Sequence, residues 1–302
     1  MPDHDIAYPQ LPSELDGVIS TISNLQPRQI PRKVVIYYQT MTVPLKDLAV
    51  AYLVESWLQM ETLWQDKQTL QQRGLKVMAM LGGACPGSFI VPDDDKSFQE
   101  WYKTLYYMLV KYKFDGIDLD IEEPMSQNGI NRLVDRLRAD FGPDFIITLA
   151  PVATALQGRA HLSGFDYLRF EGERGDKINF YNTQFYNGRG SLATTKDYDA
   201  IMAMGFPPPR VLPTLLTHRN NGTAGFIEFE KLRPVLIELR LRYPYLGGVA
   251  GWEYFNSDPG GHEMPYQWSA LVARALALLI EAHIRIQKLL VVQSSRAISQ
   301  IQ

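Results

Sequence analysis

Apolar and acidic residues alternate from Gly116 to Glu122, and this segment of the sequence is the one best suited to chemistry. In a β-strand alternate side chains point to the same face, so Asp118, Asp120 and Glu122 would share one face. Carboxylates so close together repel one another, and this repulsion raises the pH at which the last of them loses its proton. The spacing therefore predicts an acid–base site in which at least one carboxyl is protonated near neutral pH.

Glycine, polar and aromatic residues at the ends of other strand-like segments are candidates for the rest of the site. They are Gly82 and Gly83, Gln184, Tyr186 and Asn187, and Trp252 and Tyr254. Carboxylates protonate glycosidic oxygens, and aromatic side chains line the pockets that hold ligands. The set favours carbohydrate chemistry if these ends meet. Core packing is the alternative for the aromatic members, and hydrogen bonding inside the fold is the alternative for Gln184 and Asn187.

Eight short apolar runs alternate with segments of helical spacing. The runs lie at residues 33–40, 48–55, 75–81, 116–122, 145–151, 178–187, 210–217 and 247–254. The second run is ambiguous between strand and helix, and residues 152–176 are predicted to form a long connection. This alternation favours an α/β fold, a single (β/α)8 TIM barrel, in which the C-terminal strand ends form one cleft. We divide the chain into an N-terminal arm (1–30), the barrel (31–282) and a C-terminal helical tail (283–302).

The composition excludes several classes of protein. The formal charge of -3 gives no electrostatic case for binding nucleic acid or an anionic membrane, and the single cysteine, Cys85, permits no intrachain disulfide. No run of about 18 uncharged apolar residues is present, so no membrane span is predicted. Residues 1–25 lack the pattern of a signal peptide. We therefore expect a cytoplasmic location, with unconventional secretion or a removed leader as open alternatives.

Motifs for cofactors and metals are also missing from the sequence. No GxGxxG or P-loop pattern occurs at a strand–helix turn, and the histidines lack the spacing of metal ligands. We therefore expect no cofactor and no metal site.

Four segments together resemble glycoside hydrolase family 18. Asp115–Glu122 matches the DGxDxDxE signature of that family, and Met80–Gly83 resembles its third-strand SxGG box with methionine in place of serine. Gln184–Asn187 resembles the QFYN of the class III, hevamine-like chitinase branch, and Gly247–Trp252 resembles the final-strand box. The resemblance covers about residues 33–280 and implies the same barrel fold.

The resemblance also implies a role for each matching residue. Glu122 would be the general acid/base, Asp120 would hold the substrate's 2-acetamido group, and Asp118 would share a proton with Asp120. Tyr186 would donate its hydroxyl to the acetamide oxygen, and Trp252 would form the floor of the −1 subsite. In this family the acetamide oxygen itself attacks C1, which gives an oxazolinium intermediate and net retention.

Three functions are compatible with the resemblance. The first is a chitinase-like hydrolase that cleaves β-1,4 linkages of N-acetylglucosamine polymers, with chitin oligomers as the first substrate. The second is an endo-β-N-acetylglucosaminidase that cleaves the chitobiose core of N-glycans. The third is a catalytically inactive chitin-binding lectin or inhibitor, which the presence of Glu122 disfavours. The expected partner is an oligosaccharide or polysaccharide that contains N-acetylglucosamine, and the expected state is a monomer.

Overall fold

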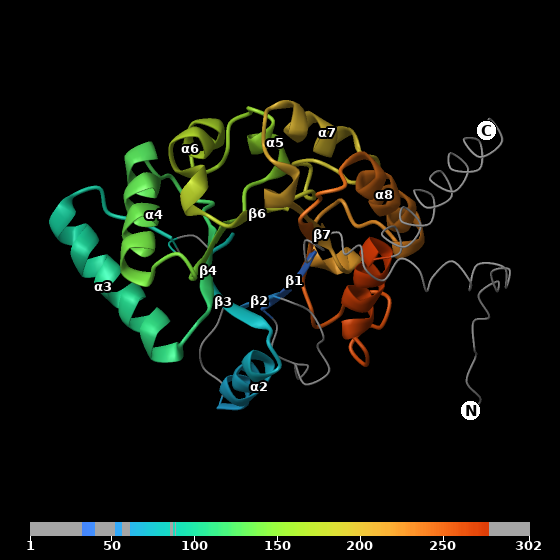
Figure 1. Ribbon diagram of the computed structural model, residues 1–302, viewed down its shortest axis with the longest axis horizontal. Coiled ribbons are helices and arrows are strands. Elements are labelled where there is room, and N and C mark those ends of the chain that lie inside the picture. Colours follow the sequence, from blue (N-terminus) through green and yellow to red (C-terminus); the bar gives the residue numbers. More distant parts are fainter. Residues whose placement is uncertain (1–31, 40–51, 56–60, 85–86, 88, 278–302) are drawn as a thin grey trace, which may run out of the picture. The chain divides into compact units, whose positions relative to one another are not determined.

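The computed structural model describes residues 32–39, 52–55, 61–84, 87 and 89–277. Within these residues eight parallel strands form a closed barrel in chain order (Figure 1). The strands are β1 (Lys33–Tyr38), β2 (Tyr52–Glu55), β3 (Lys76–Gly82), β4 (Gly116–Asp120), β5 (Ile146–Leu149), β6 (Phe180–Gln184), β7 (Val211–Leu216) and β8 (Gly248–Trp252). Pairing of β1 with β8, from Lys33 opposite Gly248 to Ile36 opposite Gly251, closes the ring.

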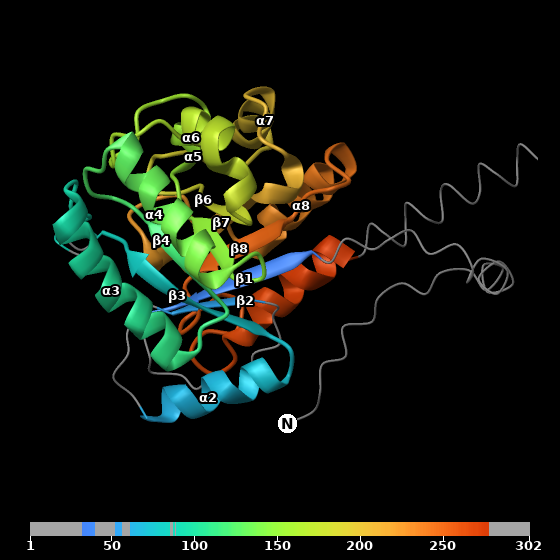
Figure 2. The ribbon, with the colours of Figure 1, turned by 60° about the vertical axis from the view of Figure 1, so that its left-hand side comes forward.

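Helices lie outside the strands in both ribbon views (Figures 1 and 2). They are α2 (Glu61–Gln72), α3 (Asp95–Tyr112), α4 (Gln127–Phe141), α5 (Ala153–Leu156), α6 (Tyr167–Arg174), α7 (Lys196–Ala203) and α8 (Phe229–Arg242), and residues 266–277 are also helical. Short 3-10 turns are η2 (Gly175–Lys177), η3 (Pro208–Arg210) and η4 (Arg219–Asn221). None of the helices that the structure describes is long and apolar enough to cross a membrane.

The helices on either side of the acidic strand both begin at a capping side chain. The Asp94 carboxylate accepts the backbone N–H of Ser97 at 2.9 Å, at the start of α3. The Ser126 hydroxyl oxygen accepts the N–H of Gly129 at 3.0 Å, at the start of α4. Such caps satisfy N–H groups that have no partner inside the helix. They therefore help to fix the residues at which α3 and α4 begin.

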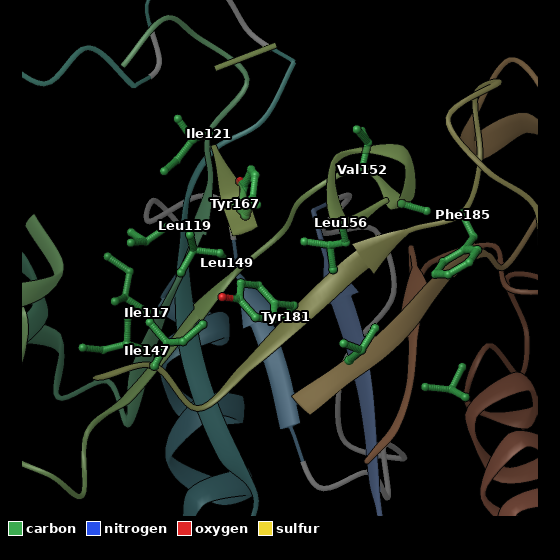
Figure 3. Close-up of a cluster of buried hydrophobic side chains, with 14 of the residues drawn as sticks. Ile117, Leu119, Ile121, Ile147, Leu149, Val152, Leu156, Tyr167, Tyr181 and Phe185 are labelled. Atoms are coloured by element: carbon green, nitrogen blue, oxygen red, sulfur yellow. The ribbon is translucent and has the colours of Figure 1, made fainter. Parts of the chain in front are cut away.

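The alternation in β4 separates an apolar face from an acidic one. Ile117, Leu119 and Ile121 are fully buried in the cluster between strands and helices, beside Leu149 of β5 and Tyr181 of β6 (Figure 3). A separate apolar cluster is formed by side chains from β1, β3, β5, β6, β7 and β8. Its buried members are Val35, Tyr37, Met78, Ile146, Phe180, Leu212 and Ala250. The acids of β4 alternate with its outward side chains, so they face the interior of the barrel.

The predicted eight strands and the barrel fold are confirmed. The ambiguous second run contains strand β2, while residues 48–51 lie outside the described residues. The acidic strand is shorter than predicted, because β4 ends at Asp120 and Glu122 follows it. Residues 152–176 are more ordered than a connecting loop, since they contain α5, α6 and the start of η2. The predicted N-terminal arm and C-terminal tail lie outside the described residues.

Candidate active site

Asp118 is fully buried inside the barrel and is bonded to three other strands. Among the described side chains, the Tyr37 hydroxyl donates to Oδ2 at 2.8 Å, and the Thr148 hydroxyl and Asn182 amide donate to Oδ1 at 2.5 and 3.0 Å. Burial raises the pKa of Asp118 above its usual value, and these hydrogen bonds oppose the rise. The donors therefore stabilise negative charge on Asp118 relative to a buried carboxyl that lacks them.

Asp120 ends β4 and is 7% exposed. Within the described part of the chain its carboxylate accepts a hydrogen bond from Gln184 Nε2, at 3.1 Å from Oδ1. Burial raises the pKa of Asp120 well above its usual value, and the negative charges of Glu122 and Asp118 raise it further. Because Asp118 has more donors, Asp120 is the member of the pair that holds a proton more readily.

Glu122 lies two residues beyond the end of β4 and is half-buried. Burial raises its pKa, whereas a hydrogen bond from Gln184 and the positive charge of Arg189 lower it. Glu122 therefore keeps its proton to a higher pH than an ordinary glutamate while it remains accessible from outside the barrel. A carboxyl in this setting can give a proton to a ligand and take one back from water.

Tyr186 follows β6 and is 8% exposed. Burial raises the pKa of its hydroxyl well above the usual value, and the charges of Asp120, Glu122 and Asp118 raise it further. The hydroxyl therefore stays protonated and can donate a hydrogen bond. The dependence on all three acids shows that the structure brings Tyr186 and the acidic segment together.

Gln184 and Asn187, both predicted substrate contacts, occupy different surroundings. Gln184 Nε2 donates to Asp120 and also to the carbonyl oxygen of Ala150, at 3.0 Å, so its amide is fixed against the acids. Asn187 is exposed, and its Oδ1 accepts the backbone N–H of Thr223 at 2.8 Å and the Thr223 hydroxyl at 3.1 Å. The Asn187 carbonyl therefore holds the loop after β7 and is not directed at the acids.

Gly82 and Gly83 allow the end of β3 to approach Asp120 closely. Their φ angles are +104° and +91°, values that favour glycine. The N–H of Gly83 donates to the carbonyl oxygen of Asp120 at 2.8 Å, and a Cβ on Gly82 would lie 2.0 Å from that oxygen. Met80 stands where the family box has serine, and it lies beside this turn. Its methyl carbon would be 3.3 Å from a Cβ on Gly83.

Trp252 and Tyr254 are both near the end of β8 but have different environments. Trp252 is half-buried, and its ring centroid lies 5.3 Å from that of Tyr37. Tyr254 is 1% exposed and packs in the cluster between strands and helices, 6.0 Å from Tyr38. The ring of Tyr254 therefore has almost no accessible surface in this structure, and its contact with a substrate stays a prediction.

The sequence did not single out several residues that surround the acids. Thr148 lies directly opposite Asp118 in the β4–β5 register, so inward alternation along β5 is a signal that could have found it. Tyr37 and Asn182 alternate inward in the same way. Arg189 lies in a Gly-Arg-Gly loop, and no periodic pattern marks it.

Glu123, which directly follows the acidic segment, makes hydrogen bonds to another loop. Its carboxylate accepts the N–H of Gly87 and, at 2.6 Å, the N–H of Phe89. It therefore joins the segment after β4 to the loop after β3, on which Gly83 lies. A contact between two loops so far apart in sequence leaves no local pattern. Among the described residues, no group of three or more His, Cys, Asp or Glu side chains is placed to hold a metal ion.

Comparison with known families and curated proteins gives consistent matches. A family model described as glycosyl hydrolases family 18 matches residues 25–207. Chitinase 1 of Rhizopus niveus is 28% identical over 212 residues, which cover 64% of this chain and 40% of that relative. Chitinase D of Niallia circulans is 26% identical over 208 residues, which cover 58% of this chain and 36% of that relative. The chain thus spans less than half the length of these curated relatives.

Two solved structures are similar over most of both chains. A fungal endo-beta-N-acetylglucosaminidase from glycosyl hydrolase family 18 has a TM-score of 0.76 and 42% identity, with 82% of this chain and 98% of that one covered. The chitinase ChiC from Aspergillus fumigatus has a TM-score of 0.72 and 42% identity, with coverages of 80% and 98%. The fold and the sequence of this chain both match the same family. The descriptions of the two similar structures name different activities.

Proposed function

The chain belongs to glycosyl hydrolases family 18, and we propose that it cleaves the β-1,4 bond on the reducing side of an N-acetylglucosamine residue with retention. The observation that carries the proposal is the graded setting of three acids in one segment. Asp118 is buried with several donors, Asp120 is buried with Gln184 as its donor, and Glu122 is half-buried at the mouth. Substrate-assisted hydrolysis needs these three settings.

In the first step Glu122 donates its proton to the glycosidic oxygen as the bond from C1 to that oxygen breaks. The bonding electron pair leaves with the oxygen. The 2-acetamido oxygen of the same sugar attacks C1 and closes an oxazolinium ring, so no carboxylate of the protein bonds to the sugar. The raised pKa of Glu122 supports this step, because the acid must still carry its proton when the substrate binds.

In the second step the Glu122 carboxylate takes a proton from water. The water oxygen bonds to C1, the ring opens, and the electron pair returns to the acetamide. Two displacements at C1 leave its configuration unchanged, and Glu122 recovers the proton that it gave in the first step. Half-exposure of Glu122 supports this step, since water must reach it.

The buried acids and Tyr186 would hold and stabilise the reacting acetamide. Asp120 would accept its N–H, and movement of the Asp120 proton toward Asp118 would leave a negative charge beside the oxazolinium nitrogen. The protonated Tyr186 hydroxyl would donate to the acetamide oxygen and hold it near C1. Trp252 would lie under the sugar ring.

Two substrate classes follow from the proposed reaction. Chitin oligomers are supported by the curated chitinases and by ChiC, and the chitobiose core of N-glycans is supported by the endo-beta-N-acetylglucosaminidase structure at the same 42% identity. A lectin without catalysis is less well supported, because the described site keeps Glu122, Asp120 and Tyr186 together.

Product analysis with chitopentaose and a high-mannose glycopeptide tests the proposal. The expected result is release of shorter products from at least one of them, with the β-anomer formed first. Cleavage of neither substrate, or initial release of the α-anomer, would contradict the proposed reaction. A Glu122→Gln protein serves as the control for contaminating glycosidases.

A further inference from the structure

Glu122 lies on a part of the chain that has already left the barrel sheet. β4 ends at Asp120, and its register with β3 ends where Gly82 lies opposite Asp120. Its register with β5 ends one residue earlier, at Leu119. A general acid must stay within hydrogen-bond reach of the oxygen that it protonates. The backbone that carries Glu122 therefore needs anchors other than the strand ladder.

One anchor is the turn after β3, which holds the residue that ends β4. The carbonyl oxygen of Asp120 accepts the N–H of Gly83 at 2.8 Å. A Cβ on Gly82 would lie 2.0 Å from this oxygen and 2.9 Å from Cδ1 of Phe89. Phe89 is 1% exposed, and its ring stacks near Trp101 of α3, with 6.2 Å between centroids and 13° between planes. The turn therefore contacts both the end of β4 and a ring that is fixed in the core.

A second anchor is Glu123, the residue directly after Glu122. Its Oε2 accepts the backbone N–H of Phe89 at 2.6 Å, and its Oε1 accepts the N–H of Gly87. Hydrogen bonds from N–H groups to an ionised carboxylate are short and about twice as strong as those between neutral groups. Glu123 thus holds the backbone of the same residue whose ring contacts the turn after β3. Asp120 and Glu123 are both joined to the loop after β3, and Glu122 lies between them.

Ile121 makes a contact of a different kind in the same segment. Its side chain is fully buried in the cluster between strands and helices. Apolar burial stabilises this position, but it is non-directional and does not set the orientation of the residues that follow. Hydrogen bonds to a carboxylate do have a preferred geometry. The orientation of the backbone at Glu122 therefore depends on Glu123 more than on Ile121.

We propose that Glu123 is a positioning residue of the active site, which keeps Asp120 and Glu122 in their catalytic positions by holding the backbone of Phe89. This inference rests on the proposed function, in which Glu122 gives and takes the proton. Misplacement of a reacting group by about 1 Å can lower a rate by about 100-fold. The proposed substrate contacts are made by other residues, so loss of Glu123 should lower kcat and leave KM little changed.

Kinetics of two Glu123 variants test the proposal on whichever of chitopentaose and the glycopeptide the wild-type protein cleaves. Glu123→Ala should lower kcat about 10- to 100-fold. Glu123→Gln keeps one oxygen that can accept the N–H of Phe89, so its kcat should lie between those of the alanine variant and the wild type. Asp94→Ala is the matched control, because it also removes a carboxylate that accepts a backbone N–H, at the start of α3. It should lower the melting temperature and leave kcat unchanged.

A wild-type kcat in Glu123→Ala, or an equal loss in Asp94→Ala, would overturn the inference. A glutamine variant as slow as the alanine variant would also overturn it, since acceptance of the Phe89 N–H would then not matter. If the alanine variant does not fold, the glutamine variant decides alone, and a wild-type kcat in it is the contrary result.

Native-state hydrogen exchange gives a second readout that needs no turnover. The amides of Gly83 and Phe89 should exchange about 10-fold faster in Glu123→Ala than in the wild type, and they should not change in Asp94→Ala. Unchanged rates in the Glu123 variant would overturn the inference. If the wild-type protein cleaves neither substrate, the proposed reaction fails, whereas the exchange rates still decide whether Glu123 holds the loop after β3.

Discussion

Asp118 and Asp120 show how hydrogen bonding gives two aspartates of one strand different states. Both are buried, and burial raises the pKa of each. Asp118 has donors from three strands, whereas Asp120 has Gln184 and lies near the charge of Glu122. In water two aspartates would bind a proton equally well. Here the different surroundings make Asp120 bind it more tightly than Asp118.

Glu122→Gln should abolish turnover and leave the fold intact. Loss of a general acid lowers rates by about 100- to 10,000-fold, and glutamine fits the same half-exposed position. The expected result is a large fall in kcat with little change in KM or in the melting temperature. Glu100→Gln, at an exposed residue of α3, is the control and should retain full activity. Substantial turnover by the Glu122 variant would assign the proton transfer to another group.

Asp120→Asn should stabilise the protein at neutral pH although it lowers activity. The folded protein binds the Asp120 proton more tightly than the unfolded chain, whose aspartates have a pKa of about 3.9. Stability from this proton is therefore complete below that pH and is lost as the pH rises toward the raised folded pKa. Asparagine cannot ionise and avoids the loss.

Melting temperatures measured from pH 3 to pH 8 test this prediction, because this range includes the ordinary aspartate pKa of about 3.9. The variant should melt above the wild type at the upper end, and the difference should close toward the lower end. Asp144→Asn, at an exposed aspartate outside the site, is the matched control. A constant difference for Asp120→Asn would show that its proton does not control stability.

At the scale of elements, the turn after β3 is as important to the site as the acidic strand. Gly82 ends β3 with a positive φ and lies so close to β4 that a Cβ would overlap the Asp120 carbonyl oxygen. The Gly83 N–H then bonds to that same oxygen. The two strand ends are thus joined through the backbone of Asp120, so the position of its carboxyl depends on the glycines of another strand.

Gly82→Ala should reduce both stability and kcat. Positive φ alone costs roughly 1–3 kcal/mol for a residue with a side chain, and the overlap with β4 adds to it and displaces Asp120. The matched control is Gly205→Ala, at a φ of +96° with no atom within 4 Å of the added Cβ. It should lower the urea midpoint and leave kcat unchanged. Equal kcat values for the two variants would show that the β3 turn does not position Asp120.

The sequence predicts the strands of this fold better than the contacts between their ends. Period-two alternation places Asp118 on the inner face and Ile117 on the outer face, as the structure has them. It does not show that β4 stops at Asp120, because the same alternation continues through Glu122. Nor does it show that β8 ends at Trp252 and that the side chain of Tyr254, two residues later, is buried in the core.

At the scale of the whole molecule, the proposed reaction makes the site depend on a group that belongs to the substrate. In the proposed reaction Asp120 and Tyr186 hold the acetamide of the substrate, and that acetamide supplies the attacking atom. Chitopentaose should therefore react far faster than cellopentaose, which has a hydroxyl at the same carbon. Chromatography of both digests measures this difference, and fully deacetylated chitosan is a second negative control. Cleavage of cellopentaose would require a different nucleophile.

Tyr37 and Trp252 stand on the first and last strands of the ring and pack on each other. During synthesis β1 emerges from the ribosome long before β8, and until β8 arrives Tyr37 has no Trp252 against it. The acids of β4 are then present without the tryptophan that we propose lies beneath the sugar. A nascent chain should consequently become active only when β8 pairs with β1 and closes the barrel. Activity should then appear late in synthesis and in a single step.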